Sequence, residues 1–513
     1  MENFMLKRYF MIKLIWNVCC YLTTGIDFKI RIIYMKTFIL SFLFFILCCV
    51  AININAQVTG KIKVACIGAS ITEGATLENK KTQSYPAQLQ TMLGDGYEVV
   101  NYGVGGCTML RKGDKPYWNM PSYKEALAGN PDIVLIDLGG NDSKLINRIY
   151  LNEYKKDYRD MIQSFASLPS HPRIIMQSPI GSFVTDTTGI WDPVIVNRII
   201  PLVKEVAFEE KCEWVNLYPL FINKPQLLPD KIHPNLEGTT MMAKSLYEVL
   251  VASRDSGFNI FRKINIPDTI SSFHGYECAD FTFKGRNCKI VRPKIAAKNH
   301  PWIWRARFWG HEPQTDIALL ERGYHVVYCD VVELLGNKEA IAAWNDYYTL
   351  LYHAGLSKKV VLEGMSRGAV YVYNWAAANP KKVACVYVDN PLLNMNDWAV
   401  KAMQAPKGSN IMFEDFKKAY NLLTDEQVKN FKGGPIDEVN KIVKGNYPSL
   451  ILCADEDEAV SPTTNTMLFE KMIKERNGKI TVIHKPGFKH HPHSLPNPTP
   501  IVDFITSAVN VSK

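Results

Sequence analysis

The sequence of 513 residues is sparing with charge, since Asp, Glu, Lys and Arg make up only 21% of it, and it holds no concentrated patch of lysine or arginine. The net charge of +9 comes partly from residues 1–56, outside which 53 basic residues face 48 acidic ones. Nucleic acid is therefore not expected as a partner. The 47% of hydrophobic residues argues against disorder, and the length suits two globular domains.

Metal-like cysteine spacing is also absent, as are internal repeats and low-complexity tracts. The 12 cysteines include no Cys-x-x-Cys pair, and four of them lie in residues 1–56. The other cysteines are scattered through apolar stretches and are expected to be small buried hydrophobic residues. Cys278 and Cys288 are a candidate disulfide pair for an oxidising compartment. The sequence predicts neither a metal nor an organic cofactor.

Residues 35–56 have the layout of a secretory signal peptide. A lysine after a methionine precedes an apolar run from residue 37 to 52, and small residues lead to Ala56. The run is short for a membrane span. We predict a leader over residues 1–56, with a start at Met35 as a hypothesis, and a secreted or periplasmic protein with no stable membrane insertion after cleavage. An uncleaved anchor is the alternative.

From residue 57 to 253, short apolar runs alternate with helical stretches. Runs this continuously apolar suit parallel strands that are buried on both faces and joined by amphipathic helices. We predict an α/β domain of three layers, flavodoxin-like, with a five-stranded parallel sheet. The five strand candidates lie at residues 61–68, 97–102, 132–139, 173–178 and 213–218.

Residues 254–273 lack a clean period and are predicted to be a linker. Apolar runs and helical stretches alternate again over residues 274–513. The first two apolar runs are joined by Lys-Gly-Arg-Asn, which resembles a hairpin turn. This alternation predicts a second α/β domain with an eight-stranded, mostly parallel sheet, in which residues 390–447 form a helical cap over the site. The strand candidates lie at residues 278–285, 287–293, 301–308, 324–331, 358–364, 383–389, 449–455 and 479–487.

Polar residues follow the strands of the first half, where ligands of open α/β sheets bind. They form four clusters, at residues 68–72, 101–106, 139–142 and 230–233. Together they supply what acyl transfer requires: a serine, a base, a carboxylate that orients the base, and donors for a negative oxygen. Asp230 and His233 are three residues apart, so one turn can place the carboxylate against the imidazole.

In order, these clusters resemble the first, second, third and fifth sequence blocks of the GDSL-like, or SGNH, hydrolase family. The resemblance covers about residues 58–253. It implies Ser70 as the nucleophile, His233 as the base and Asp230 as the acid that orients the base. It also implies that Gly106 and Asn141 complete the oxyanion hole with the backbone N–H of Ser70.

One residue departs from the family pattern. The usual Gly-Asp-Ser is Gly-Ala-Ser here, and Ala69 cannot make the hydrogen bonds by which an aspartate would fix the loop near Ser70. Taken singly, each motif residue also suits a structural role. Ser70 would serve as a helix cap, Gly106 as a turn glycine and Asn141 as a loop brace.

A second serine follows the strand at residues 358–364. It lies in Gly364-Met365-Ser366-Arg367-Gly368, a G-x-S-x-G motif between a strand and a helical run, as a nucleophile elbow requires. The order Ser, Asp, His resembles that of α/β-hydrolases over about residues 274–510. The resemblance implies Ser366 as nucleophile, Asp457 as acid, His490 as base and the Arg367 N–H as an oxyanion donor, with a second donor near Arg307 or Phe308.

Several assignments in this half stay open. Asp455 and Asp389 also follow strands and are alternatives for the acid, as His491 and His493 are for the base. The histidine cluster has no spaced carboxylate partner, so it does not predict a metal site. Trp302 and Trp304 share a strand face and are expected in the core, whereas Trp309 lies nearer the loop and is a candidate for stacking on a sugar.

The combined prediction is a secreted serine esterase with two domains. It would remove O-acyl groups, foremost O-acetyl groups, from an ester-decorated polysaccharide or oligosaccharide through an acyl-enzyme. One alternative is a single active domain beside a carbohydrate-binding or degenerate half. Another is a second domain that acts as a serine peptidase. A lipase is less favoured, because no long apolar lid lies near either site. No oligomeric state is predicted.

Overall fold

The computed structural model describes residues 60–266, 270–404 and 411–511. The predicted leader lies outside the described residues and stays a prediction. The chain divides into residues Met1–Lys61 and a compact unit, Ile62–Lys513, that contains both α/β halves. Among the described helices, none combines the length and the apolar character needed to cross a bilayer.

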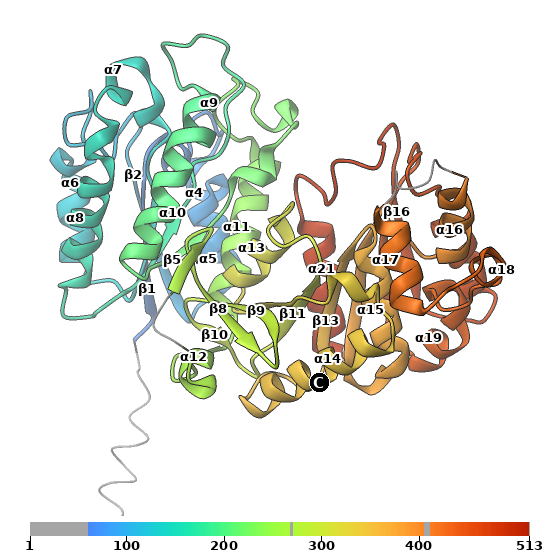
Figure 1. The fold of residues 1–513 in the computed structure, drawn as a ribbon. Coiled ribbons are helices and arrows are strands. Elements are labelled where there is room, and N and C mark those ends of the chain that lie inside the picture. The colour runs from blue at the N-terminus through green and yellow to red at the C-terminus, as the bar shows by residue number, and fades with distance from the viewer. Residues whose placement is uncertain (1–59, 267–269, 405–410, 512–513) are drawn as a thin grey trace, which may run out of the picture. The chain divides into compact units, whose positions relative to one another are not determined.

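The first half forms a sheet of five parallel strands in the order β2-β1-β3-β4-β5 (Figure 1). This is the predicted sheet, and each strand falls within or next to its predicted range. The strands are β1 (Ile62–Gly68), β2 (Tyr97–Gly103), β3 (Ile133–Asp137), β4 (Arg173–Gln177) and β5 (Glu213–Val215).

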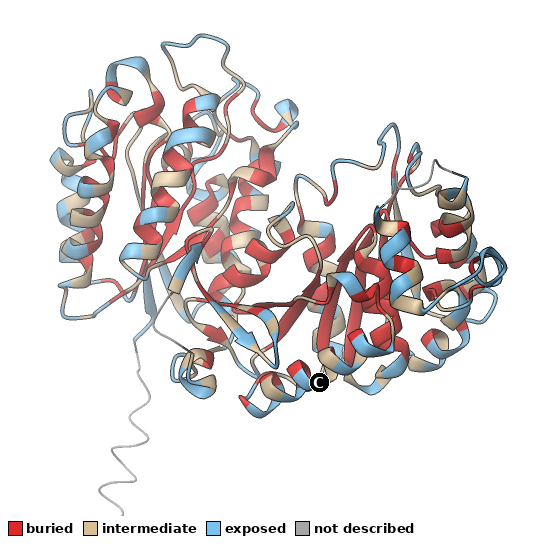
Figure 2. Ribbon diagram, in the orientation of Figure 1, coloured by how far each residue is buried: buried red, intermediate tan, exposed pale blue. Residues whose placement is uncertain are grey.

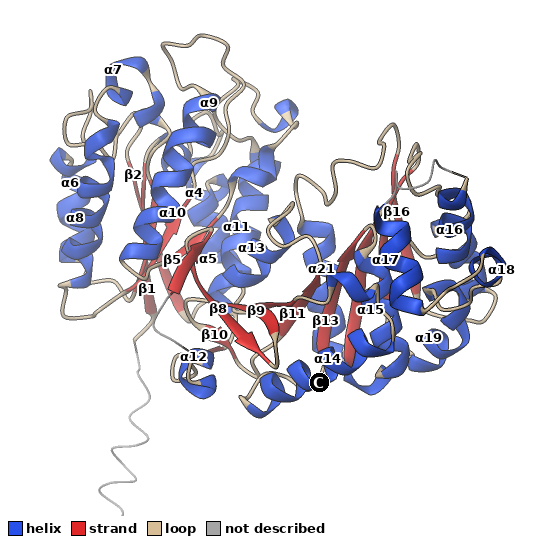
Figure 3. Cartoon of the chain, viewed as in Figure 1, coloured by secondary structure: helices blue, strands red, loops and turns tan. Residues whose placement is uncertain are grey.

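Helices cover both faces of this sheet. Alternate residues of a strand point to opposite faces, so apolar residues on each face pack against a separate layer of helices. Val64 of β1 packs in one core with α5 and α11, whereas Ala65 packs in another with α6, α8 and α10. The three predicted layers are thus confirmed (Figure 3). The helices are α5 (Tyr85–Leu93), α6 (Pro121–Ala128), α8 (Tyr154–Ala166), α10 (Ile200–Glu209) and α11 (Leu236–Val251).

The second half forms a mixed sheet of nine strands in the order β16-β15-β14-β13-β11-β12-β9-β8-β7. The six strands from β16 to β12 in this order are parallel to one another, and β9, β8 and β7 continue the sheet antiparallel. The strands are β7 (Ile270–Phe273), β8 (Tyr276–Phe283), β9 (Arg286–Arg292), β11 (Trp302–Ala306), β12 (His325–Cys329), β13 (Val360–Met365), β14 (Val383–Asp389), β15 (Ser449–Ala454) and β16 (Ile480–Lys485).

The prediction of eight strands is therefore one short. The missing strand is β7, which lies at the sheet edge inside the predicted linker. Its two central serines are exposed and only Phe273 is buried, so it carries no apolar run by which to recognise it. The predicted linker also contains α12 (Ile260–Ile264) and β6 (Arg254–Asp255), which pairs with β10 (Ala296–Ala297).

Helices also cover both faces of the second sheet, whose central strands β11 to β15 are buried (Figure 2). One face packs against α14 (Lys338–His353) and α15 (Gly368–Ala378), and the other against α13 (Gln314–Glu321) and α21 (Thr499–Val511). The segment predicted as a cap is helical: it contains α16 (Met395–Met403), α17 (Ile411–Tyr420), α18 (Asp425–Lys429) and α19 (Val439–Gly445).

The described cysteines are all free, and seven of these eight are buried, as expected for small hydrophobic residues. No bond joins Cys278 to Cys288. In the β8–β9 ladder Cys288 is opposite Phe281 and Cys278 is opposite Val291. The two cysteines are thus three positions out of register, about 10 Å along the strands, which exceeds the reach of a disulfide.

Candidate active sites

Ser70 lies at the first turn after β1. A Cβ on Gly68 would come within 2.0 Å of the Thr72 hydroxyl oxygen, so only glycine lets the chain turn this tightly into the short helix α3 (Ser70–Glu73). The cap residue of that helix is Ala69, not Ser70. The Ser70 hydroxyl instead lies 2.8 Å from Nε2 of His233.

The other ring nitrogen of His233 faces Asp230. Nδ1 lies 2.6 Å from the Asp230 carboxylate, whose second oxygen accepts the N–H groups of Ile232 and His233 at 3.0 and 2.7 Å. Partial burial would raise the pKa of Asp230, but these hydrogen bonds outweigh it and hold the pKa below its ordinary value. The ionised carboxylate therefore fixes the ring with Nε2 toward the serine. The Asp230 side chain is 41% exposed.

The predicted oxyanion loop follows β2. Gly106 has a φ of 82°, a left-handed conformation that glycine adopts without strain. A Cβ on Gly103 would lie 2.2 Å from the backbone nitrogen of Glu73, so this loop can approach α3 only with glycine there. Its backbone is also held by side chains, since the Gly105 N–H donates to Glu73 at 2.8 Å and Lys115 donates to the Gly105 carbonyl at 2.7 Å.

These contacts explain how the loop is fixed although Ala69 replaces the family's aspartate. Glu73 forms an ion pair with Lys80 at 2.5 Å, and this pair lowers the pKa of Glu73, so its carboxylate stays available to Gly105. The side-chain amide of Asn101 donates a hydrogen bond to the carbonyl of Thr72 at 2.7 Å. Glu73 was not among the residues predicted from sequence. Its spacing of three residues from Ser70, on the same helical turn, was the available signal.

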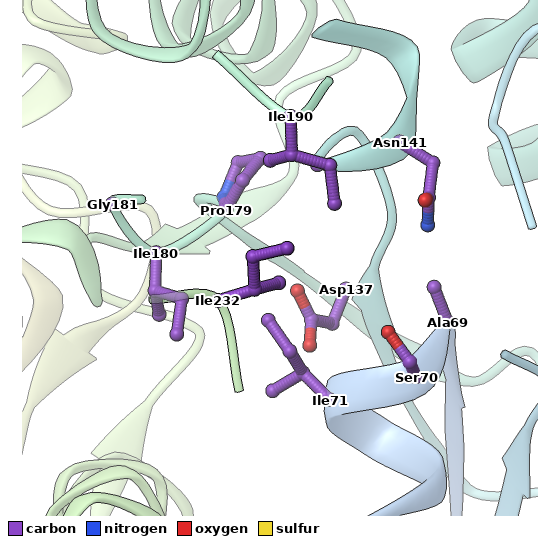
Figure 4. Close-up of a pocket in the computed structure, with 11 residues that line it drawn as sticks. Ala69, Ser70, Ile71, Asp137, Asn141, Pro179, Ile180, Gly181, Ile190 and Ile232 are labelled. Carbon is purple, nitrogen blue, oxygen red and sulfur yellow. The ribbon is translucent and has the colours of Figure 1, made fainter. Parts of the chain in front are cut away.

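A small cavity of about 30 Å³ adjoins Ser70 (Figure 4). Asn141 lies on its rim, and its amide is oriented by a hydrogen bond to the Cys107 carbonyl at 3.1 Å. The side chain of Asn141 is buried, as a preorganised donor should be. Most of the cavity wall is apolar and consists of Ala69, Ile71, Pro179, Ile180, Ile190 and Ile232.

Asp137, at the end of β3, also lines this cavity, together with the polar side chains of Ser70 and Asn141. Burial raises the pKa of Asp137 to about 7, against a smaller opposing effect of the hydrogen bond from the Thr72 hydroxyl at 3.1 Å. Among the described residues, no cation forms an ion pair with Asp137. Asp137 was predicted only as part of a strand. An acid at the end of an otherwise apolar buried run was the signal for a further role.

Ser366 forms a nucleophile elbow between β13 and α15. It has a φ of 48°, in the left-handed region, which is strained for a residue with a side chain. A Cβ on Gly364 would lie 2.6 Å from the carbonyl carbon of Gly368, and one on Gly368 would lie 2.8 Å from the carbonyl oxygen of Ala306. Both motif glycines are therefore required by close backbone contacts.

One of the candidate histidines and one of the candidate acids lie in contact with each other beside Ser366. Its hydroxyl lies 3.0 Å from Nε2 of His490, whose Nδ1 lies 2.7 Å from Asp457. Asp457 is buried and also accepts the N–H groups of residues 459 and 460. The alternative acids are engaged elsewhere: Asp455 contacts His484 at 2.6 Å, and Asp389 contacts Lys485 at 2.9 Å.

The loop predicted to supply the second oxyanion donor also adopts a strained conformation. Arg307 and Phe308 have φ values of 59° and 48°. The buried Arg305 holds this loop, donating to the Phe308 carbonyl at 3.2 Å and to the carbonyl of His311. Arg305 is itself paired with Asp316 at 2.5 Å.

A pocket of about 580 Å³ adjoins Ser366. Trp309 lines it and stays a candidate for stacking on a sugar, whereas Trp302 and Trp304 are buried in the core as expected. The cap segment contributes Trp398 of α16 and Met412 of α17, so these helices reach the site. The remaining lining includes Phe308, His311, Arg367, Leu392, Val460, His490, His491 and His493.

Comparisons with known proteins match parts of the chain. A profile of the GDSL-like Lipase/Acylhydrolase family matches residues 66–240. An acetylxylan esterase of Xylanibacter ruminicola is 39% identical over 219 residues, which cover 39% of this chain and 45% of that protein. The chain therefore spans less than half the length of this curated relative.

Solved structures resemble the chain more distantly. An acylaminoacyl peptidase of Pyrococcus horikoshii has a TM-score of 0.34 and 14% identity, over 45% of this chain and 41% of the other. A cold-adapted esterase from an Arctic intertidal metagenomic library has a TM-score of 0.32 and 15% identity, over 47% and 98% of the two chains.

In the second half, the sharp strand-to-helix turn at Ser366 has the form of a nucleophile elbow at the end of a strand of a mixed nine-stranded sheet. The family match in the first half extends from before Ser70 to beyond His233, so it includes the whole Ser70 site. Residues 66–240 thus match the GDSL-like lipase/acylhydrolase family, and a second α/β half follows them in the same chain.

Proposed function

We propose that the chain is an exported ester hydrolase with two serine sites, which removes O-acyl groups, foremost O-acetyl groups, from polysaccharide or oligosaccharide. One observation supports this proposal above all: each half aligns a serine, an imidazole and a carboxylate. The Ser–His and His–Asp distances are 2.8 and 2.6 Å in the first half. They are 3.0 and 2.7 Å in the second.

At the first site, the Nδ1–H of His233 donates a hydrogen bond to Asp230, which leaves the Nε2 lone pair for the Ser70 hydroxyl. Ser70 attacks the ester carbonyl as His233 takes its proton. The resulting oxyanion would be stabilised by the backbone N–H groups of Ser70 and Gly106 and by the Asn141 amide. His233 then protonates the departing sugar oxygen, which leaves an acyl-serine.

Water completes the reaction by the same route. His233 takes a proton from water, the resulting hydroxide attacks the acyl-serine, and the free acid leaves as Ser70 recovers its proton. At the second site Ser366, His490 and Asp457 would act in the same order, with the N–H of Arg367 as an oxyanion donor. Neither sequence of steps needs a metal or an organic cofactor.

The choice of an O-acetyl substrate has two supports. The name of the 39% identical relative is acetylxylan esterase, and the cavity beside Ser70, of about 30 Å³, leaves no space for a long acyl chain. The wider pocket beside Ser366 offers Trp309 as an aromatic surface for a sugar ring. We propose that both sites act on the same ester-decorated glycan.

The test uses the full chain in four forms: wild type, Ser70→Ala, Ser366→Ala and the double variant. Acetate release from acetylated xylan and hydrolysis of p-nitrophenyl acetate are measured for each. Each single variant should retain the activity of the other site, and the double variant should lose at least about a thousandfold. If the double variant is as active as the wild type, the proposal is wrong.

The same panel separates the alternatives. If Ser366→Ala matches the wild type on every ester, only the first half is an esterase. Binding of xylan by the inactive half would then favour a carbohydrate-binding role for it. Cleavage of peptide substrates that depends on Ser366 and not on Ser70 would instead identify the second half as a peptidase.

A further inference from the structure

Three histidines beside Ser366 converge on one point. The ring centroids of His490, His491 and His493 lie 4.9–5.0 Å apart, and the ring planes cross at 79–85°. One nitrogen from each ring lies within 4.8 Å of the other two. A fourth ring, that of His311, lies 6.0 and 5.9 Å from those of His491 and His493.

This spacing is close to that of three imidazoles around a tetrahedral zinc ion. Zinc–nitrogen bonds are about 2.0–2.1 Å long, and the ring centroid lies about 1.1 Å beyond the nitrogen. At tetrahedral angles the three centroids would then be about 5 Å apart. Small rotations of side chains would suffice to direct the three nitrogens at a shared ion.

Two of the histidines also have the carboxylate support that metal ligands usually have. Nδ1 of His490 faces Asp457 at 2.7 Å, and Nδ1 of His493 faces Asp389 at 3.4 Å, so an ion would bind Nε2 of each ring; in His490 this nitrogen lies 3.0 Å from the Ser366 hydroxyl. Asp389 is held in turn by Lys485 and by the N–H of Ser494. Such partners fix the tautomer and raise the basicity of a ligand.

Solvent reaches this cluster. His311, His490, His491 and His493 all line the pocket of about 580 Å³ beside Ser366. The His491 side chain is exposed, whereas that of His493 is buried. An ion could therefore enter from solution and meet a preformed arrangement.

We propose that His490, His491 and His493 form a reversible site for a divalent transition-metal ion of the zinc type, and that occupancy switches off the Ser366 site. The Nε2 lone pair of His490 cannot bind a metal ion and accept the Ser366 proton at once. The ion is thus an inhibitor and not a cofactor. Binding of the ion does not depend on the proposed function, but its effect on catalysis does.

The binding test titrates zinc chloride into untagged, chelator-treated full chain by calorimetry. The wild type should bind one ion at this cluster, and His491→Ala should bind it at least about tenfold more weakly. Because His491 is exposed, this variant should fold, which its thermal unfolding midpoint checks. Equal affinity in the two proteins would overturn the proposal.

A matched control is available on the same sheet. Cys453, Asp455 and His484 also bring their ligand atoms within 4.8 Å of one another, so they are a competing site for the ion. Asp455→Asn should leave unchanged the zinc binding that is sensitive to His491→Ala. If Asp455→Asn abolishes it instead, the ion binds at the other cluster and the proposal is wrong.

Inhibition is measured in the Ser70→Ala background, as the ratio of esterase activity without zinc to activity with zinc. This ratio should be large, should return to one with chelator, and should fall at least about tenfold when His491→Ala is added. A ratio of one for a protein that does bind zinc would refute the inhibition. Zinc binding without any Ser366-dependent activity would support the metal site and contradict the esterase role of the second half.

Discussion

The two serine sites place the same three groups in contact but surround them differently. At Ser70 the acid is 41% exposed and the adjoining cavity measures about 30 Å³. At Ser366 the acid is 2% exposed and the pocket measures about 580 Å³. The contact geometry therefore supports the same proposed chemistry at both sites. Burial of the acid and the size of the pocket should separate the sites in their sensitivity to loss of the acid and in their substrate range.

The sites also differ in a buried acid that belongs to neither triad. Asp137 lines the cavity beside Ser70, with the Thr72 hydroxyl as its hydrogen-bond partner. In the second sheet Asp389 forms an ion pair with Lys485, and both are buried. An unpaired buried carboxyl is accommodated best when protonated, whereas a paired one depends on its cation.

The largest contrast is expected when each triad acid is replaced by asparagine. Asp457→Asn should lower kcat at the Ser366 site by about ten-thousandfold, because the amide stabilises the wrong tautomer of His490 and the position of the acid is buried. The loss of kcat caused by Asp230→Asn at the Ser70 site should be at least about tenfold smaller. At this exposed position water can accept a hydrogen bond from the Nδ1–H of His233. The comparison is made with p-nitrophenyl acetate, using Ser70→Ala and Ser366→Ala backgrounds.

If both substitutions lower kcat equally, exposure of the acid does not distinguish the sites. The Asp455→Asn variant is the control, because Asp455 contacts His484 and not His490. It should leave kcat at the Ser366 site within about twofold of the parent.

The next largest effect should be on stability, at Asp389. Asp389→Asn leaves the buried Lys485 ammonium without its counter-charge and should destabilise the fold by about 3–5 kcal/mol. The thermal unfolding midpoint measures this loss. Lys485→Met together with Asp389→Asn removes the unpaired charge and should recover part of the stability. Failure of the double variant to recover any would show that the ion pair is not the cause.

Replacement of Asp137 should increase stability, in contrast to replacement of Asp389. The pKa of Asp137 is raised to about 7, so between about pH 4 and pH 7 the folded state keeps a proton that the unfolded chain has lost. Stability should therefore fall as pH rises through this window and level off above it. The Asp137→Asn variant lacks this loss, so above pH 7 its free energy of unfolding should exceed that of the wild type by about 2–4 kcal/mol.

Unfolding midpoints of the two proteins across the range from acid to alkaline pH measure this difference. Asp142 and Glu321, whose pKa values burial also raises to about 7, titrate in both proteins and cancel in the comparison. A difference that does not grow with pH would mean that Asp137 is ionised in the folded protein throughout.

Acyl length sharpens the contrast between the pockets. The Ser70 site should favour p-nitrophenyl acetate over the octanoate by about a hundredfold in kcat/KM, because its cavity of about 30 Å³ excludes a long chain. The Ser366 site, with about 580 Å³, should vary by less than about tenfold. Ile190→Ala, which enlarges the small cavity, should raise octanoate activity at Ser70 only. Similar acyl preferences at the two sites would remove pocket size as the distinguishing feature.

Much of this arrangement could be predicted from sequence, for identifiable reasons. Continuous apolar runs predicted both sheets, and the ordered motifs predicted which residues would meet Ser70 and Ser366. The edge strand β7 was missed because its central residues are exposed and polar. The choice among Asp389, Asp455 and Asp457 depended on turns after the strands, and those turns are set by contacts such as Lys485 with Asp389 that no local pattern encodes.

The smallest predicted effect concerns how each oxyanion loop is held. In the second domain the loop at Phe308 is fixed by Arg305, which is buried against Asp316, so replacing it would disturb the core as well. In the first domain Glu73 holds Gly105 from a partly exposed position, and substitution there tests the loop alone. Glu73→Ala should lower kcat at the Ser70 site by about tenfold with little change in KM, because a misplaced loop weakens transition-state contacts and not substrate binding.

Glu73→Gln separates the hydrogen bond from the charge. The amide oxygen can still accept the Gly105 N–H, although the ion pair with Lys80 is lost, so most of kcat should return. If Glu73→Gln were as slow as Glu73→Ala, the charge of Glu73 would matter more than its hold on the loop. If neither variant were slower than the parent, the contacts of Asn101 and Lys115 would be sufficient to position the loop without Glu73, and the replacement of the family's aspartate by Ala69 would need no compensation from this helix.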